Sequence, residues 1–386
     1  MNTPRTLLIE GWRSIPHSYA IINSFQCLEF LKEPNLTLRH RDIPYANPRW
    51  KDANRAFPQQ AHDTIAAIPA LGPNEKYDAV YRITYPYIVR SSDPRKALVY
   101  GTAEYRCIPS TYIVGGGPVG AALRNSSAII VAPSNWSRDG FLAAGANPDR
   151  VIVVPNGIDP EIFHPMPDAD RLQQRSQIAD AFVFLSLGAM TGNKGILDLL
   201  KAFAIVAQKF PHVRIVLKGM GQLYQSKGLF VAYANQLTMP ERQIIQPRIT
   251  YVDNTLSFTD MARLYQLADV YVSPYKGEGF NMPVLEAAAC GIPVICTAGG
   301  ATDDFTTDDF ALRVNATRLP CHQDPDGAGT ILQIDFDHLV HQMMTAVESR
   351  ELAPKARVAG PAFVANGFTW RQVTQKLLKI LFDDDV

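Results

Sequence analysis

Short β-rich segments alternate with helix-like patterns along the whole chain. In the first half they are residues 6–10, 36–41, 78–84, 97–101 and 127–132, and in the second half 182–188, 213–218, 249–252, 270–273 and 293–297. Several are apolar throughout, as expected for strands of a parallel sheet with helices on both faces. The pattern predicts an α/β fold built from repeated βα units.

The segment after Lys194 gives the clearest helical pattern. Its apolar residues recur at intervals of three and four and form one stripe: Ile196, Leu199, Leu200, Phe203, Val206, Ala207 and Phe210. Pro211 ends the pattern, because proline is not tolerated inside a helix.

The length of 386 residues predicts two domains, since domains commonly contain roughly 100 to 200 residues. A strand-like run at 151–165 meets Asn-Gly and several prolines, and a polar stretch follows before the next strand. We place the boundary between residues 155 and 180, which gives an N-terminal domain over 1–160 and a C-terminal domain over 175–370.

Charge and cysteine content exclude several classes of protein. The 37 basic and 37 acidic residues balance, so no global field favours nucleic acid or an anionic membrane, although peripheral membrane contact is left open. The 5 cysteines form no CxxC pair and indicate neither a disulfide framework nor a zinc site. Because no apolar run resembles a secretory signal or a membrane span, we expect a cytoplasmic protein without a transmembrane segment.

Residues 271–297 carry the most informative pattern. A strand ends near Ser273, a loop containing Gly277 and Gly279 follows, and a short helix then opens with Pro283 in its first turn. Backbone N–H groups at such a helix start, together with the helix dipole, suit a phosphate group. We therefore expect the backbone of Gly279, Phe280, Asn281 and Met282 to contact an anionic ligand at the carboxyl edge of a sheet.

Two carboxylates flank this expected phosphate site. Glu278 lies in the loop and Glu286 is expected on the first turn of the helix. Since a carboxylate accepts paired hydrogen bonds from neighbouring hydroxyls, Glu286 suits a ribose diol and Glu278 suits the hydroxyls of a sugar. The alternative for Glu286 is a glutamate that only complements its helix dipole.

The segment with Glu278 and Glu286 forms an E-x7-E pattern followed by AAACGIPVICTAGG, and it resembles the retaining, nucleotide-sugar-dependent group 1 glycosyltransferases. VVPNGIDPEIFHP at 153–165 and GNKGILDLLKAF at 192–203 are similar to two further signatures of that family. The resemblance implies a GT-B fold with two Rossmann-like domains whose parallel sheets face across a cleft. It also implies that a final helix at 371–383 packs back on the N-terminal domain, which would bind the acceptor while the C-terminal domain binds the donor.

The resemblance also implies roles for single residues. Lys194 would neutralise the diphosphate, Glu286 would hold the ribose, and Glu278 would contact the transferred sugar, so that Lys194 and Glu278 are the expected catalytic pair. Val252 and Asp253 would lie near the base.

A glycine after the first strand also agrees with the family. Gly11 would let its loop approach the donor phosphates, and the alternative is a plain turn glycine.

Two departures from the family pattern leave questions open. Ala189 stands where the family usually has an arginine, and Lys218 either supplies the missing charge or is a plain strand-end lysine. The family also often has a histidine after a first-domain strand, whereas residues 97–106 contain none. The acceptor-side candidates are therefore His17, Thr102, Glu104 and Tyr85, each with a purely structural alternative.

The implied reaction is transfer of a sugar from a nucleoside diphosphate sugar, with UDP or GDP expected, to a hydroxyl acceptor such as a carbohydrate. Anomeric configuration would be retained by same-face substitution, without a metal ion and without a resident cofactor, because Lys194 and a helix start can stabilise the leaving diphosphate. The alternatives are a nucleotide-sugar 2-epimerase and a catalytically silent nucleotide-sugar-binding partner subunit. The base, the sugar, the acceptor and the oligomeric state are left open by the sequence.

Overall fold

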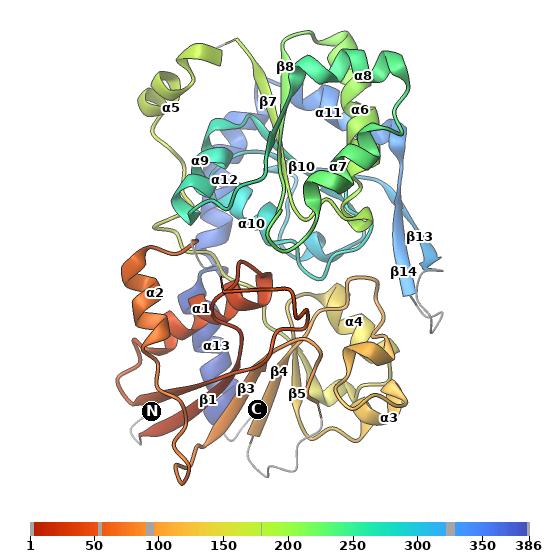
Figure 1. The fold of residues 1–386 in the computed structure, drawn as a ribbon. Helices are drawn as coiled ribbons and strands as arrows, with labels where there is room; N and C mark the ends of the chain where they lie inside the picture. Colours follow the sequence, from red (N-terminus) through yellow and green to blue (C-terminus); the bar gives the residue numbers. More distant parts are fainter. Residues whose placement is uncertain (1–3, 53–55, 90–95, 179, 322–328, 384–386) are drawn as a thin grey trace. The chain divides into compact units, whose positions relative to one another are not determined.

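The computed structural model describes residues 4–52, 56–89, 96–178, 180–321 and 329–383. The chain divides into two compact units (Figure 1). Unit 1 combines the chain up to Gly157 with Pro320–Thr330 and the chain from Phe368 onward, and unit 2 combines Ile158–Leu319 with Ile331–Gly367. Each unit contains its own six-stranded sheet, so the predicted α/β fold is confirmed.

The sheet of unit 1 is parallel and has the strand order β2-β1-β3-β4-β5-β6. Its strands are β1 (Arg5–Gly11), β2 (Leu36–Asp42), β3 (Ala79–Ile83), β4 (Lys96–Tyr100), β5 (Ile129–Ala132) and β6 (Val151–Val153). Its helices include α1 (Ser18–Phe30), α2 (Gln59–Ala66), α3 (Val119–Arg124) and α4 (Asn135–Ala143). The strand order reverses beside β1, so the loop after β1 lies at a topological switch point, where open α/β sheets bind ligands.

Helix α13 (Trp370–Phe382) packs in unit 1 against α1, as the blue and red helices show (Figure 1). The rings of Trp370 and Phe25 stack with their centroids 5.3 Å apart. Val373 and Leu377 are buried in the same contact face. A capping box at Thr369 fixes the start of the helix, and the amphipathic pattern supplies its buried side.

The sheet of unit 2 has the order β12-β11-β10-β7-β8-β9 and is also parallel. Its strands are β7 (Phe182–Leu187), β8 (Val213–Lys218), β9 (Ile249–Val252), β10 (Val270–Ser273), β11 (Val294–Thr297) and β12 (Ala311–Val314). The order reverses between β7 and β10. The loops after these two strands are therefore expected to form the ligand site of this unit.

Helices cover the sheet of unit 2 on both faces. Helix α6 (Ile196–Lys209) packs with α8 (Met239–Ile245) and α11 (Phe336–Glu348), while α10 (Met282–Ala289) packs with α9 (Phe258–Leu267) and α12 (Leu352–Ala365). Helices α5 (Asp168–Gln174) and α7 (Ser226–Ala234) complete the unit. The predicted stripe of α6 is buried from Ile196 to Ala207, and the helix ends before Pro211 as expected.

All the strands predicted from the sequence are present, with ends that differ by one or two residues. Strands β12, β13 (Ala316–Cys321) and β14 (Gly329–Ile334) were not predicted, because they are short or carry several polar residues. All 5 cysteines are free and buried in this structure. Within the described residues, no helix is both long and apolar enough to cross a membrane.

Candidate active site

The β7–α6 loop and the β10–α10 loop meet at the switch point of unit 2. Gly195, the residue before α6, has the left-handed φ of 67°, and a Cβ atom there would overlap the carbonyl oxygen of Pro274. Glycine is therefore needed at this position both for the backbone conformation and for the close approach of the two loops. The contact brings residues on either side of the switch point together.

Lys194 and Glu278 form an ion pair between these two loops. Lys194 lies on a single helical turn, Gly192–Lys194, and a Cβ atom at Gly188 would lie 3.5 Å from its Cε atom. Its Nζ contacts Oε1 of Glu278. The Glu278 side chain is only 7% exposed, whereas that of Lys194 is 22% exposed. The structure thus brings the two expected catalytic residues together.

Asn193 joins the same two loops by hydrogen bonds. Its Nδ2 donates to the carbonyl of Gly277 at 3.0 Å, and its own carbonyl accepts from the N–H of Lys276 at 2.7 Å. Thr191 Oγ1 donates to Asn193 Oδ1 at 2.6 Å, which orients the amide. Sequence reasoning missed Asn193, whose only signal was its place beside Lys194 in the GNKG segment.

The backbone before α10 takes an unusual conformation. Asn281 has a left-handed φ of 77°, which asparagine tolerates better than most residues, and its Nδ2 donates to Ser273 Oγ at 2.9 Å. Phe280 is buried with its ring against Phe305, at a centroid distance of 4.6 Å. The side chains of Phe280 and Asn281 therefore fix the loop, and only the backbone of this segment is suited to contact a ligand.

Glu286 lies on the second turn of α10. The prediction from the sequence that it lies on the first turn is wrong. The helix begins at Met282, one residue earlier than Pro283, and Glu286 is therefore its fifth residue. Complementing the helix dipole does not explain a glutamate there, because that effect is confined to the first turn. Glu286 Oε2 accepts a hydrogen bond from the Tyr265 hydroxyl at 2.6 Å. Burial raises the pKa of the Glu286 carboxyl to about 7.

Lys218 is buried at the end of β8, next to Leu187 of β7. Its Nζ contacts the carbonyl oxygen of Gly219, and burial lowers its pKa while the nearby Asp253 carboxylate opposes that effect. Ser226 Oγ donates to the carbonyl of Ala189 at 2.9 Å, which ties the β7–α6 loop to the start of α7. The structure thus places a buried ammonium on the strand beside the loop that contains Ala189.

Val252 and Asp253, which were expected near the base, follow each other at the end of β9. The Tyr251 hydroxyl donates to Asp253 Oδ1 at 3.4 Å. Gly221 lies so close to this carboxylate that a Cβ atom there would be 2.8 Å from Oδ1. The β8 and β9 ends are therefore in contact through Asp253, Tyr251 and Gly221.

Gly11 ends β1 in unit 1 and packs tightly. A Cβ atom there would lie 2.9 Å from the carbonyl oxygen of Ile83 and 3.0 Å from Asn23 Nδ2. This packing explains a glycine at position 11 by itself, so the expected contact with donor phosphates stays a prediction.

The structure links two acceptor-side candidates, His17 and Thr102, through Tyr19. The Tyr19 N–H donates to His17 Nδ1 at 3.2 Å, and the Tyr19 hydroxyl is 3.2 Å from Thr102 Oγ1. The Tyr87 hydroxyl donates to the Thr102 carbonyl at 2.6 Å and lies 3.1 Å from the Tyr19 hydroxyl. Sequence reasoning missed Tyr19, which lacks any distinguishing spacing.

The other two acceptor-side candidates are Glu104 and Tyr85, which contact other residues of unit 1. Glu104 is exposed, and its backbone carbonyl accepts from Trp136 Nε1 at 2.9 Å. Tyr85 is half-buried with its ring edge-on to Tyr112 at 4.8 Å. Desolvation by burial raises the pKa of Tyr85, so this hydroxyl stays protonated at neutral pH.

A comparison with known protein families shows which family the C-terminal part of the chain resembles. Residues 181–323 match the family model described as glycosyl transferases group 1. This part of the chain is similar to the group 1 glycosyltransferases. The matched residues include Lys194, Lys218, Glu278 and Glu286, and the predicted family resemblance is confirmed.

Curated relatives match over a shorter part of their own length. The D-inositol 3-phosphate glycosyltransferase of Mycobacterium bovis (strain BCG / Pasteur 1173P2) is 28% identical over 257 residues, which is 65% of this chain and 47% of that protein. A protein of the same name from Mycobacterium tuberculosis (strain ATCC 25618 / H37Rv) gives the same values. The chain thus spans about half the length of the curated relatives it matches.

Solved structures match over nearly the whole chain. Anabaena Alr3699/HepE, in complex with UDP and glucose, aligns with a TM-score of 0.70 and 15% identity over 98% of this chain and 99% of that one. A glycosyltransferase from Rickettsia africae ESF-5 aligns with a TM-score of 0.70 and 15% identity over 100% of both chains. These similarities, together with the two Rossmann-like sheets, identify the fold as GT-B, as predicted.

Proposed function

We propose that this protein transfers a sugar from a nucleoside diphosphate sugar to a hydroxyl acceptor, with retention of anomeric configuration. The observation that carries the proposal is the pairing of Lys194 with Glu278 between the β7–α6 and β10–α10 loops. An ammonium and a carboxylate lie side by side at the switch point of the unit 2 sheet, and this pairing supports a role for Lys194 at the diphosphate and for Glu278 at the sugar.

The donor diphosphate would be held by charge and by backbone. Lys194 supplies a partly exposed ammonium, and the start of α10 supplies N–H groups from the segment that includes Gly279 and Met282. Helix starts attract anions because their N–H groups lack intrahelical partners and because the dipole is positive there. On donor binding the ammonium of Lys194 would move from Glu278 to the diphosphate.

Glu286 would hold the ribose of the donor. Its ionised carboxylate can accept one hydrogen bond from each hydroxyl of a diol, while Tyr265 keeps donating to Oε2 and fixes the orientation of the group. The raised pKa of Glu286 means that the free site contains both protonated and ionised forms near neutral pH. Hydroxyls that donate to the carboxylate would favour the ionised form.

The chemical step breaks the bond between the anomeric carbon and the phosphate oxygen and forms a bond to the acceptor oxygen on the same face. The acceptor proton passes to the departing phosphate oxygen. Lys194 and the N–H groups before α10 stabilise the charge that develops on the diphosphate, so this chain's own groups meet the requirement without a metal ion. Glu278 accepts hydrogen bonds from hydroxyls of the transferred sugar and fixes its position.

Lys218 would replace the arginine that the family usually has at position 189. Lys218 is buried at the end of β8, and its backbone carbonyl accepts a hydrogen bond from the N–H of Gly188, the residue before Ala189, at 3.0 Å. A lysine that is buried without a carboxylate in direct contact has a lowered pKa, and an incoming diphosphate would restore full charge to it. An anionic ligand would therefore stabilise the charged form of Lys218 more than it would stabilise that of an exposed lysine.

UDP is the nucleotide that we favour for the donor. The structural relative HepE has been solved with UDP, with UDP-glucose, and with UDP and glucose. In this chain Val252 and Asp253 at the end of β9 are the residues proposed to lie near the base. A hydroxyl of a carbohydrate is the proposed acceptor, as in glycan biosynthesis.

The test is a thermal-shift panel of nucleoside diphosphates and their sugars, followed by product analysis by proton NMR. Binding to the folded state raises the melting temperature by mass action, so a hit names base and sugar together. The donor that binds is then incubated with saccharide acceptors, and the anomeric coupling constant of the product is measured. An α-linked product from an α-linked donor supports retention, whereas an inverted product contradicts it. An epimerised nucleotide sugar formed without acceptor, or binding without any turnover, would replace transfer by one of the two alternatives.

A further inference from the structure

An aromatic cluster lies at the carboxyl edge of the unit 1 sheet, in the loops that follow β1 and β2. It consists of Trp12, His17, Tyr45 and Trp50, which we call the aromatic platform. The His17 ring is 5.0 Å from that of Trp50 and 5.1 Å from that of Trp12, measured between centroids. Within the cluster, Trp12 is buried, whereas the other three side chains are partly exposed.

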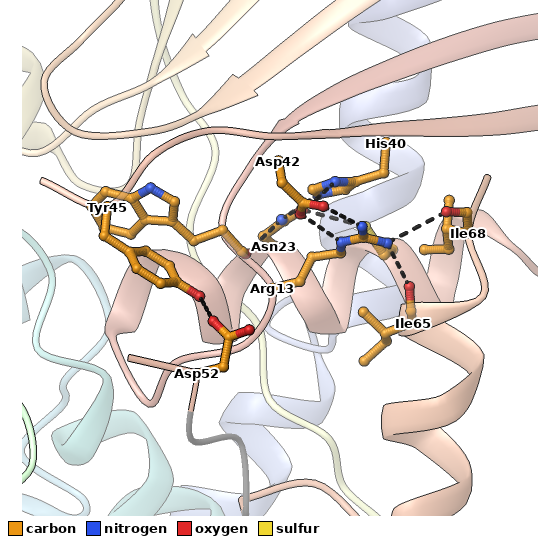
Figure 2. Close-up of polar contacts among 10 residues, drawn as sticks. Arg13, Asn23, His40, Asp42, Tyr45, Asp52, Ile65 and Ile68 are labelled. Atoms are coloured by element: carbon orange, nitrogen blue, oxygen red, sulfur yellow. Dashed lines mark hydrogen bonds and ion pairs between the residues drawn. The ribbon is translucent and has the colours of Figure 1, made fainter. Parts of the chain in front are cut away.

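Hydrogen bonds hold the platform in place. Trp12 Nε1 donates to the carbonyl of Pro44 at 3.2 Å, which joins the loop after β1 to the loop after β2. The Tyr45 hydroxyl donates to Asp52 Oδ1 at 2.5 Å and so anchors the outer end of the ring (Figure 2). The Trp12 and Tyr45 rings are therefore fixed before any ligand arrives, which lowers the entropy cost of binding.

A polar network that includes the buried side chains of Asn23 and His40 fixes the same two loops (Figure 2). Asn23 Nδ2 donates to the carbonyl of Trp12 at 2.8 Å and lies 2.9 Å from His40 Nε2. Since Nδ2 is a donor, His40 Nε2 accepts and its proton sits on Nδ1, 3.3 Å from Asp42 Oδ1. Arg13 in turn donates from Nε and Nη2 to the two Asp42 oxygens, at 2.8 and 2.5 Å.

His17 is placed to donate a hydrogen bond at the platform surface. It precedes α1 as the N-cap residue, and its Nδ1 accepts from the N–H of Tyr19 at 3.2 Å. The proton of the neutral ring therefore sits on Nε2, for which no hydrogen-bond partner is found among the described residues. Burial lowers the pKa of His17 to about 4, so the ring is neutral at physiological pH.

We propose that the aromatic platform, with the Nε2–H of His17, is a binding site for a sugar ring. The faces of aromatic rings pack against the C–H faces of pyranoses, and a fixed N–H beside them suits a ring hydroxyl. His17 acts here as a donor and not as a base, because its other nitrogen is already used by the helix cap. The ligand is a carbohydrate, and under the proposed function, on which this step rests, it is the acceptor.

The architecture of the helix cap allows the donor role of His17 to be separated from its structural role. Asparagine is a favoured N-cap residue whose side-chain oxygen can accept from the N–H of Tyr19. His17→Asn therefore keeps the cap and loses only the distal donor, whereas His17→Ala loses both. Trp50→Leu removes the outer ring of the platform. Phe382→Leu, at the end of α13 in the same unit, is the control, because it is partly exposed and lies outside the platform.

Binding is measured on the full chain by saturation-transfer NMR and tryptophan fluorescence, with methyl glycosides of glucose, galactose and mannose and with maltose and cellobiose. We expect at least one saccharide to bind, and His17→Asn and Trp50→Leu each to weaken that binding by roughly tenfold, as for the loss of one good contact. Melting temperature should fall for His17→Ala but not for His17→Asn. The rise in melting temperature that UDP causes should be the same in His17→Asn and Trp50→Leu as in the wild type.

The outcomes separate this inference from the proposed function. If the chain binds a saccharide through the platform but no nucleotide, the sugar site stands and the proposed function fails. If UDP binds but no saccharide on the panel binds, or if binding is equal in wild type, His17→Asn and Trp50→Leu, the platform is not a sugar site. In a chain that turns over, His17→Asn should raise the KM for the acceptor about tenfold and leave the KM for the donor unchanged.

Discussion

The ammonium of Lys194 contacts the carboxylate of Glu278, although the two residues are 84 positions apart in the sequence. The contact joins the loops on the two sides of the strand-order reversal in unit 2. Lys194 is thereby held in place before a ligand arrives. Because of this contact, a diphosphate that enters the site would compete with Glu278 for the ammonium of Lys194.

This competition predicts that Glu278→Gln separates nucleotide binding from turnover. The affinity for UDP should stay equal or increase, because Lys194 no longer has to leave a carboxylate, while kcat falls because the transferred sugar loses its charged anchor. Calorimetry with UDP and an assay of transfer check the two halves. Lys209→Ala, on an exposed lysine that pairs with Glu348, is the matched control for altered charge. Weaker UDP binding in Glu278→Gln would contradict the competition.

The close approach at Gly195 predicts a large loss of stability in Gly195→Ala. The new Cβ would overlap the Pro274 carbonyl, and alanine disfavours the φ of 67°. We expect the free energy of unfolding to fall by about 2 kcal/mol or more. Gly228→Ala in α7 is the control, because no atom lies within 4 Å of its Cβ position and alanine should raise helix stability by about 0.5 to 1 kcal/mol. Equal urea midpoints for the two variants would refute the packing argument.

The raised pKa of Glu286 predicts a pH-dependent affinity for the donor. The ionised carboxylate binds the ribose hydroxyls, and burial shifts its pKa to about 7, so the affinity for UDP-glucose should rise between pH 6 and pH 8. UDP-glucose is the right probe because its diphosphate does not titrate in that range. Glu286→Gln should bind weakly at every pH and lose the slope. A wild-type affinity that is constant over this range would disprove the link between ionisation and binding.

The same pKa predicts that Glu286→Gln stabilises the protein. The carboxyl has a pKa of about 7 in the folded chain against an ordinary value of 4.5, so the folded state keeps its proton longer than the unfolded state. The free energy of unfolding therefore falls as the pH rises from 4.5 to about 7. At pH 8 the variant should be more stable by roughly 1 to 3 kcal/mol, and at pH 4 the difference should vanish. Urea unfolding at the two pH values tests the sign.

A charge swap between Ala189 and Lys218 tests which residue supplies the second cation. Lys218→Met should raise the free energy of unfolding at neutral pH, because it removes a buried ammonium whose pKa is lowered, and it should weaken UDP binding. Adding Ala189→Arg should recover much of that lost affinity, since it restores a cation beside the same loop. If Lys218→Met binds UDP as wild type does, Lys218 is a plain strand-end lysine.

Periodicity in the sequence was sufficient to predict most of the fold. Strands such as β8 and helices such as α6 have apolar patterns that only one type of element can bury. The two-stranded sheet of β13 and β14 escaped prediction because β13 contains ATRLPC, in which only Cys321 is buried. Helix α12 was missed because Pro361 lies inside it. Local sequence is a poor guide to secondary structure where tertiary contacts outweigh the intrinsic propensity of the residues.

Motif spacing located the site but not its geometry. Lys194, Glu278 and Glu286 were all found from the sequence, since glycines, a proline and carboxylates at fixed offsets mark a phosphate loop. The ion pair, the Asn193 bridge and the Tyr265 hydrogen bond could not be predicted, because each joins segments that are brought together only by the fold. The turn assigned to Glu286 was wrong because the left-handed Asn281, before Pro283, sets where the helix begins.

Calorimetric titration of UDP into the wild-type chain, Lys194→Ala and Glu286→Ala tests the central claim most directly. The account predicts saturable binding at one site, weakened in each variant by about 1.5 to 3 kcal/mol, the range for hydrogen bonds to charged groups. Both variants should keep the wild-type fold, as checked by circular dichroism. An absence of UDP binding to the wild type, or a UDP affinity that is unchanged in both variants, would contradict it.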